Sequence, residues 1–309
     1  MEPTITQLAI FNPEHDLCLG NGRAHYVPPR SAVDFARRAA DIMSVLYPDA
    51  HCTSIYDLPR QDSSPKLGEV PEGRRSVSTS IIPWGWNLVL KQQLLDRGIS
   101  PALLPSDEAL AAIRHLQHRA TLLPLQPDCQ AISDPSQFSI LNFQFSILKS
   151  PWSGAGRGLR WISGKPTPHD IAWAAKVIRE QGCVIAQPRY DVADDFALLY
   201  RIEDNGLHFV GYSLFQTSAG VYRGNLLLPD PDIQARTGLT PQLKESIESW
   251  LRTNLVGHYE GPLGVDLFRT VEGDIHIAEL NLRHTMGHVA HAHLRLHPEA
   301  QGTLFSPTF

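Results

Sequence analysis

The chain has 309 residues, of which 42% are hydrophobic and 19% are charged, a composition typical of a soluble globular protein. A formal net charge of -5 provides no global basic field, so general nucleic-acid binding is not expected, although a local basic pocket for phosphate stays open. No stretch reaches the roughly 18 apolar residues that a membrane-spanning helix needs, and residues 1–10 lack the pattern of a signal peptide. We therefore expect a cytoplasmic protein with neither a membrane nor a nucleic-acid partner.

The first third of the chain alternates predicted strands and helices. The predicted strands are 7–11, 53–56, 80–82 and 99–104, and the predicted helices are 31–47, 88–97 and 106–123. A polar stretch at 61–73 is expected to be a surface loop. The alternation predicts a small, mainly parallel α/β domain over residues 1–117.

The remainder of the chain is dominated by predicted hairpins. Two of them turn at Asp204-Asn205-Gly206 and at Glu272-Gly273, and a helix is expected at 240–255 between them. We expect an α+β unit with antiparallel sheets over 118–309. The tract 138–148 contains the tetrapeptide Phe-Ser-Ile-Leu twice, and only its second copy can be placed, directly before Lys149.

The hairpin around Glu272-Gly273 carries two acids that should face each other. Antiparallel pairing about that centre places Asp266 opposite Glu279, and Asn281 projects from the same face. Opposed like charges destabilise a sheet, and a cation between them would remove the repulsion. Two carboxylates and an amide suit Mg²⁺ or Mn²⁺ better than zinc. The open alternative is an ion pair with Arg283 or Arg269, and a one-residue slip of register would remove the site.

Lys149 ends an apolar run and precedes a glycine-rich loop. Glycines permit close approach of the backbone to a ligand, successive N–H groups can bind an anion, and a lysine adds a point charge for phosphate. The loop is neither a Walker A motif nor a Rossmann fingerprint, and a solvated lysine beside a flexible turn is the alternative. Its candidate binding residues are Ser153, Gly154, Gly156, Arg157 and Gly158.

Taken in order, these segments resemble the ATP-grasp superfamily, in particular its D-alanine–D-alanine ligase and biotin carboxylase branches, over residues 118–292. The resemblance implies a preceding α/β domain followed by a two-lobed ATP-grasp domain, with lobes 118–186 and 187–309. It places Lys149, Arg119 and the glycine-rich loop on the phosphates of ATP, and Asp266, Glu279 and Asn281 on Mg²⁺ or Mn²⁺. It further implies that Gln187, Arg189 and Tyr190 form the adenine linker and that Asp195 binds the ribose.

The resemblance also implies a reaction, in which ATP phosphorylates a small-molecule or peptide carboxylate and an amine attacks the acyl phosphate. Arg283 and Arg223 are the candidates for stabilising the transferred phosphate. A kinase-like phosphotransferase and a non-catalytic ATP-binding protein are the alternatives. The partners would be carboxylate and amine substrates, and a homodimer is a default expectation.

Other polar residues have weaker interpretations. The loop Asn12–Asp16 follows a strand and either binds the acceptor substrate or caps a turn. His284, His288 and His291 would share one helix face. We expect that face to be a polar helix surface and not a transition-metal site. Trp84 and Trp86 are expected to pack in the core. The four cysteines form no C-x-x-C pair and are expected to be reduced thiols, mostly buried.

Overall fold

The computed structural model describes residues 6–59, 79–139, 146–153, 158–218 and 220–306. The predicted loop 61–73, the middle of the 138–148 tract, and Gly154, Gly156 and Arg157 lie outside the described residues. None of the helices in the described part is both long and apolar enough to cross a membrane.

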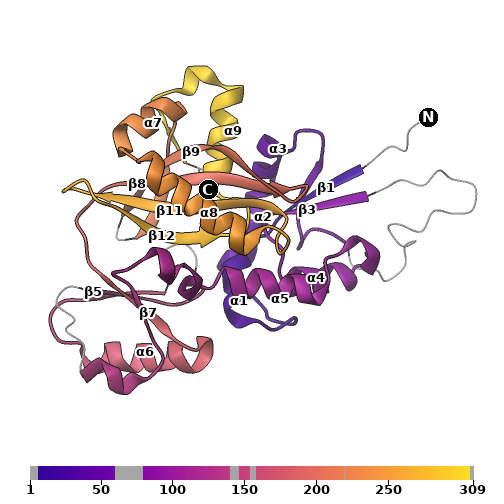
Figure 1. Cartoon of the computed structure of the whole chain (residues 1–309). Helices are drawn as coiled ribbons and strands as arrows, with labels where there is room; N and C mark the ends of the chain where they lie inside the picture. The colour runs from indigo at the N-terminus through magenta and orange to yellow at the C-terminus, as the bar shows by residue number, and fades with distance from the viewer. Residues whose placement is uncertain (1–5, 60–78, 140–145, 154–157, 219, 307–309) are drawn as a thin grey trace, which may run out of the picture.

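A small parallel sheet forms the N-terminal part, as predicted, with the strand order β2-β1-β3. Its strands are β1 (Thr6–Phe11), β2 (His51–Ser54) and β3 (Thr79–Pro83). The accompanying helices are α1 (His15–Asn21), α2 (Arg30–Arg38), α3 (Met43–Leu46), α4 (Leu88–Leu95) and α5 (Asp107–Leu116), and a short 3-10 helix, η1 (Ala40–Ile42), joins α2 to α3. In Figure 1 this part lies to the right of the other two sheets.

Three of the predicted elements in this part are wrong. The expected strand 99–104 is a 3-10 turn, η2 (Pro101–Leu103), because Ser100 accepts a hydrogen bond from the Ala102 N–H and Pro101 has no N–H for a sheet ladder. The expected helix 31–47 is interrupted at Ala39, between α2 and η1. The expected helix 106–123 starts at its Ser106 cap but ends at Leu116, and η3 (Arg119–Leu125) follows.

A second, four-stranded sheet has the order β4-β7-β5-β6, and its pairs are antiparallel. The strands are β4 (Gln130–Ile132), β5 (Ser146–Lys149), β6 (Leu159–Ile162) and β7 (Val184–Pro188), and η4 (Pro135–Ser139) follows β4. One face of this sheet packs against α6 (Pro168–Gln181), whose Ala174 and Val177 share a core with Leu148 and Val184. The side chains that alternate with Leu148 therefore point to the face that α6 leaves uncovered.

The third sheet has six strands in the order β12-β11-β8-β9-β10-β13. They are β8 (Val192–Glu203), β9 (Gly206–Ser218), β10 (Val221–Leu226), β11 (Gly261–Thr270), β12 (Ile275–Asn281) and β13 (Leu304–Phe305). The β8–β9 hairpin confirms the predicted turn, in which Asp204 and Asn205 have φ of 50° and 56°. The predicted helix 240–255 is also confirmed, as α8 (Pro241–Leu255) with Thr240 as its cap.

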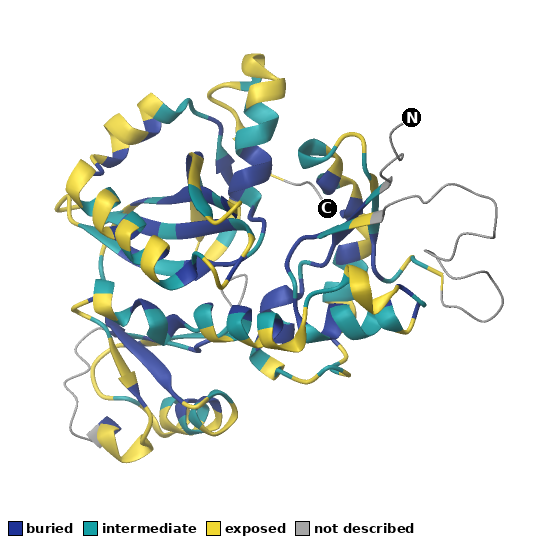
Figure 2. Cartoon of the chain, turned by 45° about the vertical axis from the view of Figure 1, so that its right-hand side comes forward, coloured by how far each residue is buried: buried dark blue, intermediate teal, exposed yellow. Residues whose placement is uncertain are grey.

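The two faces of this third sheet have different coverings. Phe196, Leu198 and Tyr200 of β8 share a core with Ile247 and Leu251 of α8, and α7 (Asp230–Thr237) extends the same layer. The alternate side chains of β8 point to the opposite face. In Figure 2 the central strands are mostly dark blue, whereas the outer helices carry exposed residues on their solvent side.

Helix α9 (Met286–Leu296), which precedes η5 (Pro298–Ala300), joins the first sheet to the third. Its Val289 is fully buried in one core with Ala9, Phe11 and Trp84. The Trp84 ring meets the Phe11 ring edge-on at 5.0 Å, and the Trp84 carbonyl accepts a hydrogen bond of 2.8 Å from the His284 N–H. Trp84 is thus a core residue, as predicted.

Substituting Gly85 by alanine is expected to destabilise the protein. A Cβ at Gly85 would lie 2.6 Å from Nδ1 of His15, a ring that is fully buried and cannot retreat. Such overpacking costs about 1–3 kcal/mol. The matched control is Gly20→Ala, where the added Cβ would meet Trp152 at an ordinary 3.4 Å. Urea denaturation of both variants tests this, and equal stability would contradict the assigned packing.

Candidate functional site

A cavity of about 530 Å³ is lined by side chains from the uncovered faces of the four-stranded and six-stranded sheets. The four-stranded sheet contributes Ile147, Lys149 and Gln187, and the six-stranded sheet contributes Asp195, Ala197, Ser213, Asp266 and Glu279. Arg119, Ser153, Arg189, Tyr190, Asn281 and Arg283 complete the predicted residues that line it. Residues from about 120 to 283 thus converge on one cleft between two sheets.

The acidic hairpin has the predicted register at its acids. Asp266 pairs with Glu279, and Asn281, two residues further on, pairs with Gly264. The Asn281 Nδ2 donates a hydrogen bond of 3.0 Å to Oδ2 of Asp266. Neither Arg283 nor Arg269 forms a direct ion pair with these acids, because Arg283 pairs with Asp16 and Arg269 with Asp194, although the charge of Arg283 partly offsets the rise in the pKa of Asp266 that burial causes. Instead, Arg119 forms an ion pair of 2.5 Å with Glu279.

The chemistry of this acidic set fits a hard divalent cation. Burial, together with the neighbouring Glu279 carboxylate, raises the pKa of Asp266 to about 7, and a bound cation would reverse that shift. Its donors would be carboxylate and amide oxygens, which Mg²⁺ and Mn²⁺ prefer. No group of three or more His, Cys, Asp or Glu side chains is placed to hold a metal within the described ranges, so a metal here depends on Asn281 as well as the two acids.

Lys149 and Arg119 give the cavity two cations beside the acids. Burial, and then the charge of Arg119, lowers the pKa of Lys149 to about 8. The Arg119 Nη1 donates to the Ser150 carbonyl at 2.5 Å and to Ser153 Oγ at 2.8 Å. Gly158 has φ of 82° and a Cβ there would lie 2.7 Å from Ser153 Cβ, so this position requires glycine. Both described ends of the glycine-rich loop are thereby fixed beside Arg119.

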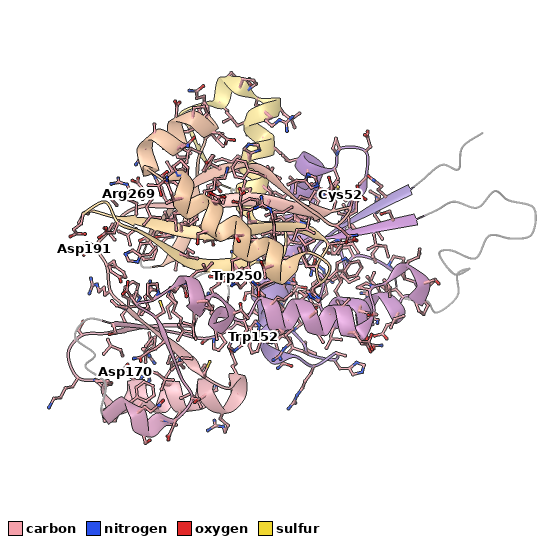
Figure 3. The ribbon with its side chains drawn as sticks, viewed as in Figure 1. Cys52, Trp152, Asp170, Asp191, Trp250 and Arg269 are labelled. Atoms are coloured by element: carbon pink, nitrogen blue, oxygen red, sulfur yellow. The ribbon has the colours of Figure 1, made fainter. Side chains whose placement is uncertain are left out.

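Trp152 fastens the start of this loop to the rest of the protein. Its indole N–H donates to the Arg114 carbonyl at 2.9 Å, and the Arg114 guanidinium lies 4.0 Å above its ring. Its backbone N–H donates to Gln181 at the end of α6. In Figure 3, Trp152 lies where the four-stranded sheet meets α5.

The opposite part of the cavity is lined by the predicted linker. Gln187 is buried, whereas Arg189 is exposed at the rim, 5.6 Å from the centre of the Trp161 ring. Tyr190 stacks on His276 with ring centres 4.1 Å apart. Asp195 accepts a hydrogen bond of 2.7 Å from Thr217, and burial raises its pKa.

Arg223 and Gly158 are the described candidates from the predicted binding and catalytic set that do not line the cavity. A β-bulge between Tyr222 and Gly224 interrupts the pairing of β10 with β9, and Arg223 in the bulge is exposed. As a result, both Tyr222 and Asn225 face the cavity. Strict alternation along β10 cannot place these two residues on one face, so the sequence pattern does not reveal them.

Tyr222 and Asn225 form a neutral polar chain with Ser213, which sequence reasoning missed. The Tyr222 hydroxyl donates to Oδ1 of Asn225, and the Asn225 Nδ2 donates to Ser213 Oγ at 2.6 Å. Cross-strand pairs Asp266↔Ala197 and Ala197↔Ser213 place Ser213 two strands from Asp266, about 10 Å at the usual strand spacing. The small Ala197 side chain between them leaves the floor of the cavity open.

The candidate histidines do not form a metal site. His284 precedes α9 and its Nε2 lies 3.0 Å from the Tyr47 hydroxyl, whereas His288 Nδ1 caps the helix at Thr285. His291 lies 3.6 Å from Asp230. The three side chains have separate partners, so the expectation of a shared helix face is wrong for His284.

The N-terminal loop contacts this site through Asp16. Asn12 donates to the Gly85 carbonyl at 2.9 Å, and the buried Asp16 accepts from Nη2 of Arg283 at 2.9 Å. Although burial opposes ionisation of Asp16, Arg283 lowers its pKa below the ordinary value. The Asn12 side chain therefore joins the segment after β1 to Gly85 after β3, while Asp16 contacts a predicted catalytic residue.

Comparison with solved structures identifies the fold. The structure of N5-carboxyaminoimidazole synthetase from Staphylococcus aureus, complexed with ADP, matches 93% of this chain and 73% of its own, with a TM-score of 0.51 and 14% identity. D-alanyl-alanine synthetase A from Vibrio cholerae matches 93% of this chain and 91% of its own, also with a TM-score of 0.51 and 14% identity. The chain has the ATP-grasp fold. An N5-carboxyaminoimidazole synthase from Aspergillus clavatus, in complex with ADP and 5-aminoimidazole ribonucleotide, matches 94% of the chain at a TM-score of 0.50 and 11% identity.

No family model matches the sequence, and no curated protein matches it significantly. The ATP-grasp fold is therefore visible in the arrangement of the sheets and not in overall sequence identity. Within that fold, the cleft between the four-stranded and six-stranded sheets is where the described acids and cations meet.

Proposed function

We propose that this ATP-grasp protein is an ATP- and Mg²⁺-dependent ligase that activates a carboxylate for attack by an amine. The observation that carries the proposal is the composition of one cavity. An opposed acid pair, two cations and a polar linker from distant parts of the chain line the same cleft. The structural neighbours that bind ADP are synthetases, which supports the ligase class.

The nucleotide would lie along the cleft, with adenine near Gln187 and Tyr190, ribose near Asp195, and phosphates near Lys149 and Arg119. Asp266, Glu279 and Asn281 would hold Mg²⁺ or Mn²⁺, which when bound neutralises phosphate charge. Ser153 and the glycine-rich loop, including Gly154, Gly156, Arg157 and Gly158, would cover the phosphates. Arg189 would contact the nucleotide at the rim of the cavity.

The reaction follows from this placement. A carboxylate oxygen of the acid attacks the γ-phosphorus of ATP and ADP leaves, and an amine then displaces phosphate from the acyl phosphate. Arg283 lines the cavity and would stabilise the transferred phosphate. We propose that the acid extends toward Ser213, Tyr222 and Asn225, which offer neutral hydrogen-bonding groups about 10 Å from Asp266.

A thermal-shift titration with Mg-ATP, followed by ADP-release assays, tests the proposal. Ligand that binds only the native state raises the melting temperature, by an amount that grows with concentration. ADP release that requires both an acid and an amine supports a ligase. ADP release with a stable phosphorylated acid indicates the kinase-like alternative, and tight binding without turnover indicates a non-catalytic ATP-binding protein. Absence of any Mg-ATP shift would refute all three.

Replacing Lys149 by methionine is expected to weaken Mg-ATP binding by about tenfold or more, because a charge partner of the phosphates is lost. The methionine fits a half-buried site without adding volume. The control is Lys165→Met, at an exposed loop position outside the cavity. Isothermal titration with Mg-ATP measures both, and unchanged affinity in Lys149→Met would remove Lys149 from the phosphate site.

A further inference from the structure

We propose that Asp16 is a positioning residue that keeps Arg283 from pairing with Asp266, so that this carboxylate stays available to a divalent cation. The inference rests on the proposed metal site. It assigns a role to the N-terminal loop, which no other part of the proposed function uses.

The contacts of Arg283 show how its charge is directed. Nε lies 3.2 Å from Oδ1 of Asp16 and Nη2 lies 2.9 Å from Oδ2, a two-point contact that fixes the plane of the guanidinium. Nη1 donates to the His284 carbonyl at 3.0 Å. Nη2 also donates to Asn281 Oδ1 at 2.9 Å. Four donations of Arg283 are thereby committed, two of them to Asp16.

Arg283 is separated from the acid pair by a single amide. Asn281 accepts from Arg283 through Oδ1 and donates through Nδ2 to Oδ2 of Asp266 at 3.0 Å. A guanidinium that lost Asp16 would have the Asp266 carboxylate as its nearest alternative anion along this chain of contacts. In low-dielectric surroundings such a pair is strongly attractive, and it would place an arginine where a metal ion binds.

Asp16 is itself held in place. It is 5% exposed, it lies in the first turn of α1, and Gln117 Nε2 donates to its Oδ1 at 2.6 Å. The Oε1 of the same Gln117 accepts from the Leu282 N–H at 3.1 Å, directly beside Arg283. Three segments, around residues 16, 117 and 282, therefore fix the direction of one arginine.

The test measures binding of Mn²⁺ in the presence of ADP by electron paramagnetic resonance, so it needs no knowledge of the acid or amine. Asp16→Asn is expected to weaken Mn²⁺ binding by about tenfold or more, the range seen when an orienting partner of a metal site is lost. Arg283→Met alone gives the reference affinity of a protein that lacks the guanidinium and its contact with Asn281 Oδ1. The double variant Asp16→Asn/Arg283→Met should recover the affinity of Arg283→Met, because the competing cation is gone. Asp232→Asn, an exposed aspartate in the first turn of α7, is the control.

Two results would overturn this inference and leave the proposed function standing. The first is native Mn²⁺ affinity in Asp16→Asn. The second is a double variant that binds Mn²⁺ as weakly as Asp16→Asn, which would mean that Asp16 acts through folding. A wild-type protein that binds no Mn²⁺ with ADP would instead refute the proposed function together with the inference. If Asp16→Asn does not fold, Gln117→Met keeps both charges and removes the hydrogen bonds of Gln117 to Asp16, to the Leu282 N–H and to the His15 ring. It should weaken Mn²⁺ binding to a smaller degree, and native affinity in that variant would equally overturn the role of Asp16.

Discussion

Glu279→Gln is expected to abolish metal-dependent nucleotide turnover while leaving the fold intact. The substitution removes one of two opposed carboxylates, and with it an anionic ligand of the proposed cation. Loss of a group that stabilises transferring charge commonly costs about a hundredfold or more in rate. The fold should persist because glutamine keeps an oxygen that can accept from Arg119, the present partner of Glu279.

ADP release with Mg²⁺, measured alongside circular dichroism, checks this expectation. Glu272→Gln is the matched control, since Glu272 is an exposed glutamate in the turn of the same hairpin. Turnover at the wild-type rate in Glu279→Gln would mean that the acid pair does not serve the reaction. Loss of activity in both variants would point to damage of the hairpin instead.

Glu14→Gln is expected to stabilise the protein at pH 8 by about 3 kcal/mol. Burial raises the pKa of Glu14 from 4.5 to about 7, Tyr56 donates to one of its oxygens at 2.8 Å, and the other oxygen has no hydrogen-bond partner within the described chain. The folded protein therefore holds a proton on Glu14 that the unfolded chain has released between these two pH values. Wild-type stability should fall as the pH rises from 4.5 to 7, and glutamine removes that dependence.

Urea denaturation of wild type and variant from pH 5 to pH 8 measures the effect. The advantage of Glu14→Gln should grow with pH and level off above pH 7. Glu245→Gln, an exposed position on α8, should give no such trend. A difference that is constant over this range would show that the carboxyl of Glu14 does not titrate as assigned.

The acid pair could be predicted from sequence, although the turn next to it could not. We predicted a hairpin centred on Glu272-Gly273, which places Asp266 opposite Glu279. In the structure Arg269 pairs with Ile275 near the turn, so the centre of the hairpin lies half a residue earlier there. A register shift after Asp266 leaves Ala278 as the extra residue and restores the predicted pairing at the acids. The predicted centre was half a residue from the observed one, and the bulge compensates for that difference at the acids, where the resemblance to the ATP-grasp superfamily had indicated the same pair independently.

The remaining differences arise from bulges and from long-range contacts. Alternation along β10 cannot reveal a bulge, so Arg223 was placed in the site and Tyr222 and Asn225 were not. The partnership of Asp16 with Arg283 joins residues 267 positions apart, and no local pattern carries it. The alternation of strands and helices correctly predicted the parallel sheet. It also predicted a strand at 99–104, where the structure has a 3-10 helix. The division at 117/118 and 186/187 stays a prediction, although β7 does end nearby, at Pro188.

The core shared by Val289 of α9 with Ala9 and Phe11 of β1 has a consequence for biogenesis. Strand β1 cannot complete its packing until about 280 further residues have been synthesised, since Val289 follows it at that distance along the chain. During that interval the nascent sheet exposes apolar surface that α9 helps to cover in the native protein, and such surface is a binding target for chaperones.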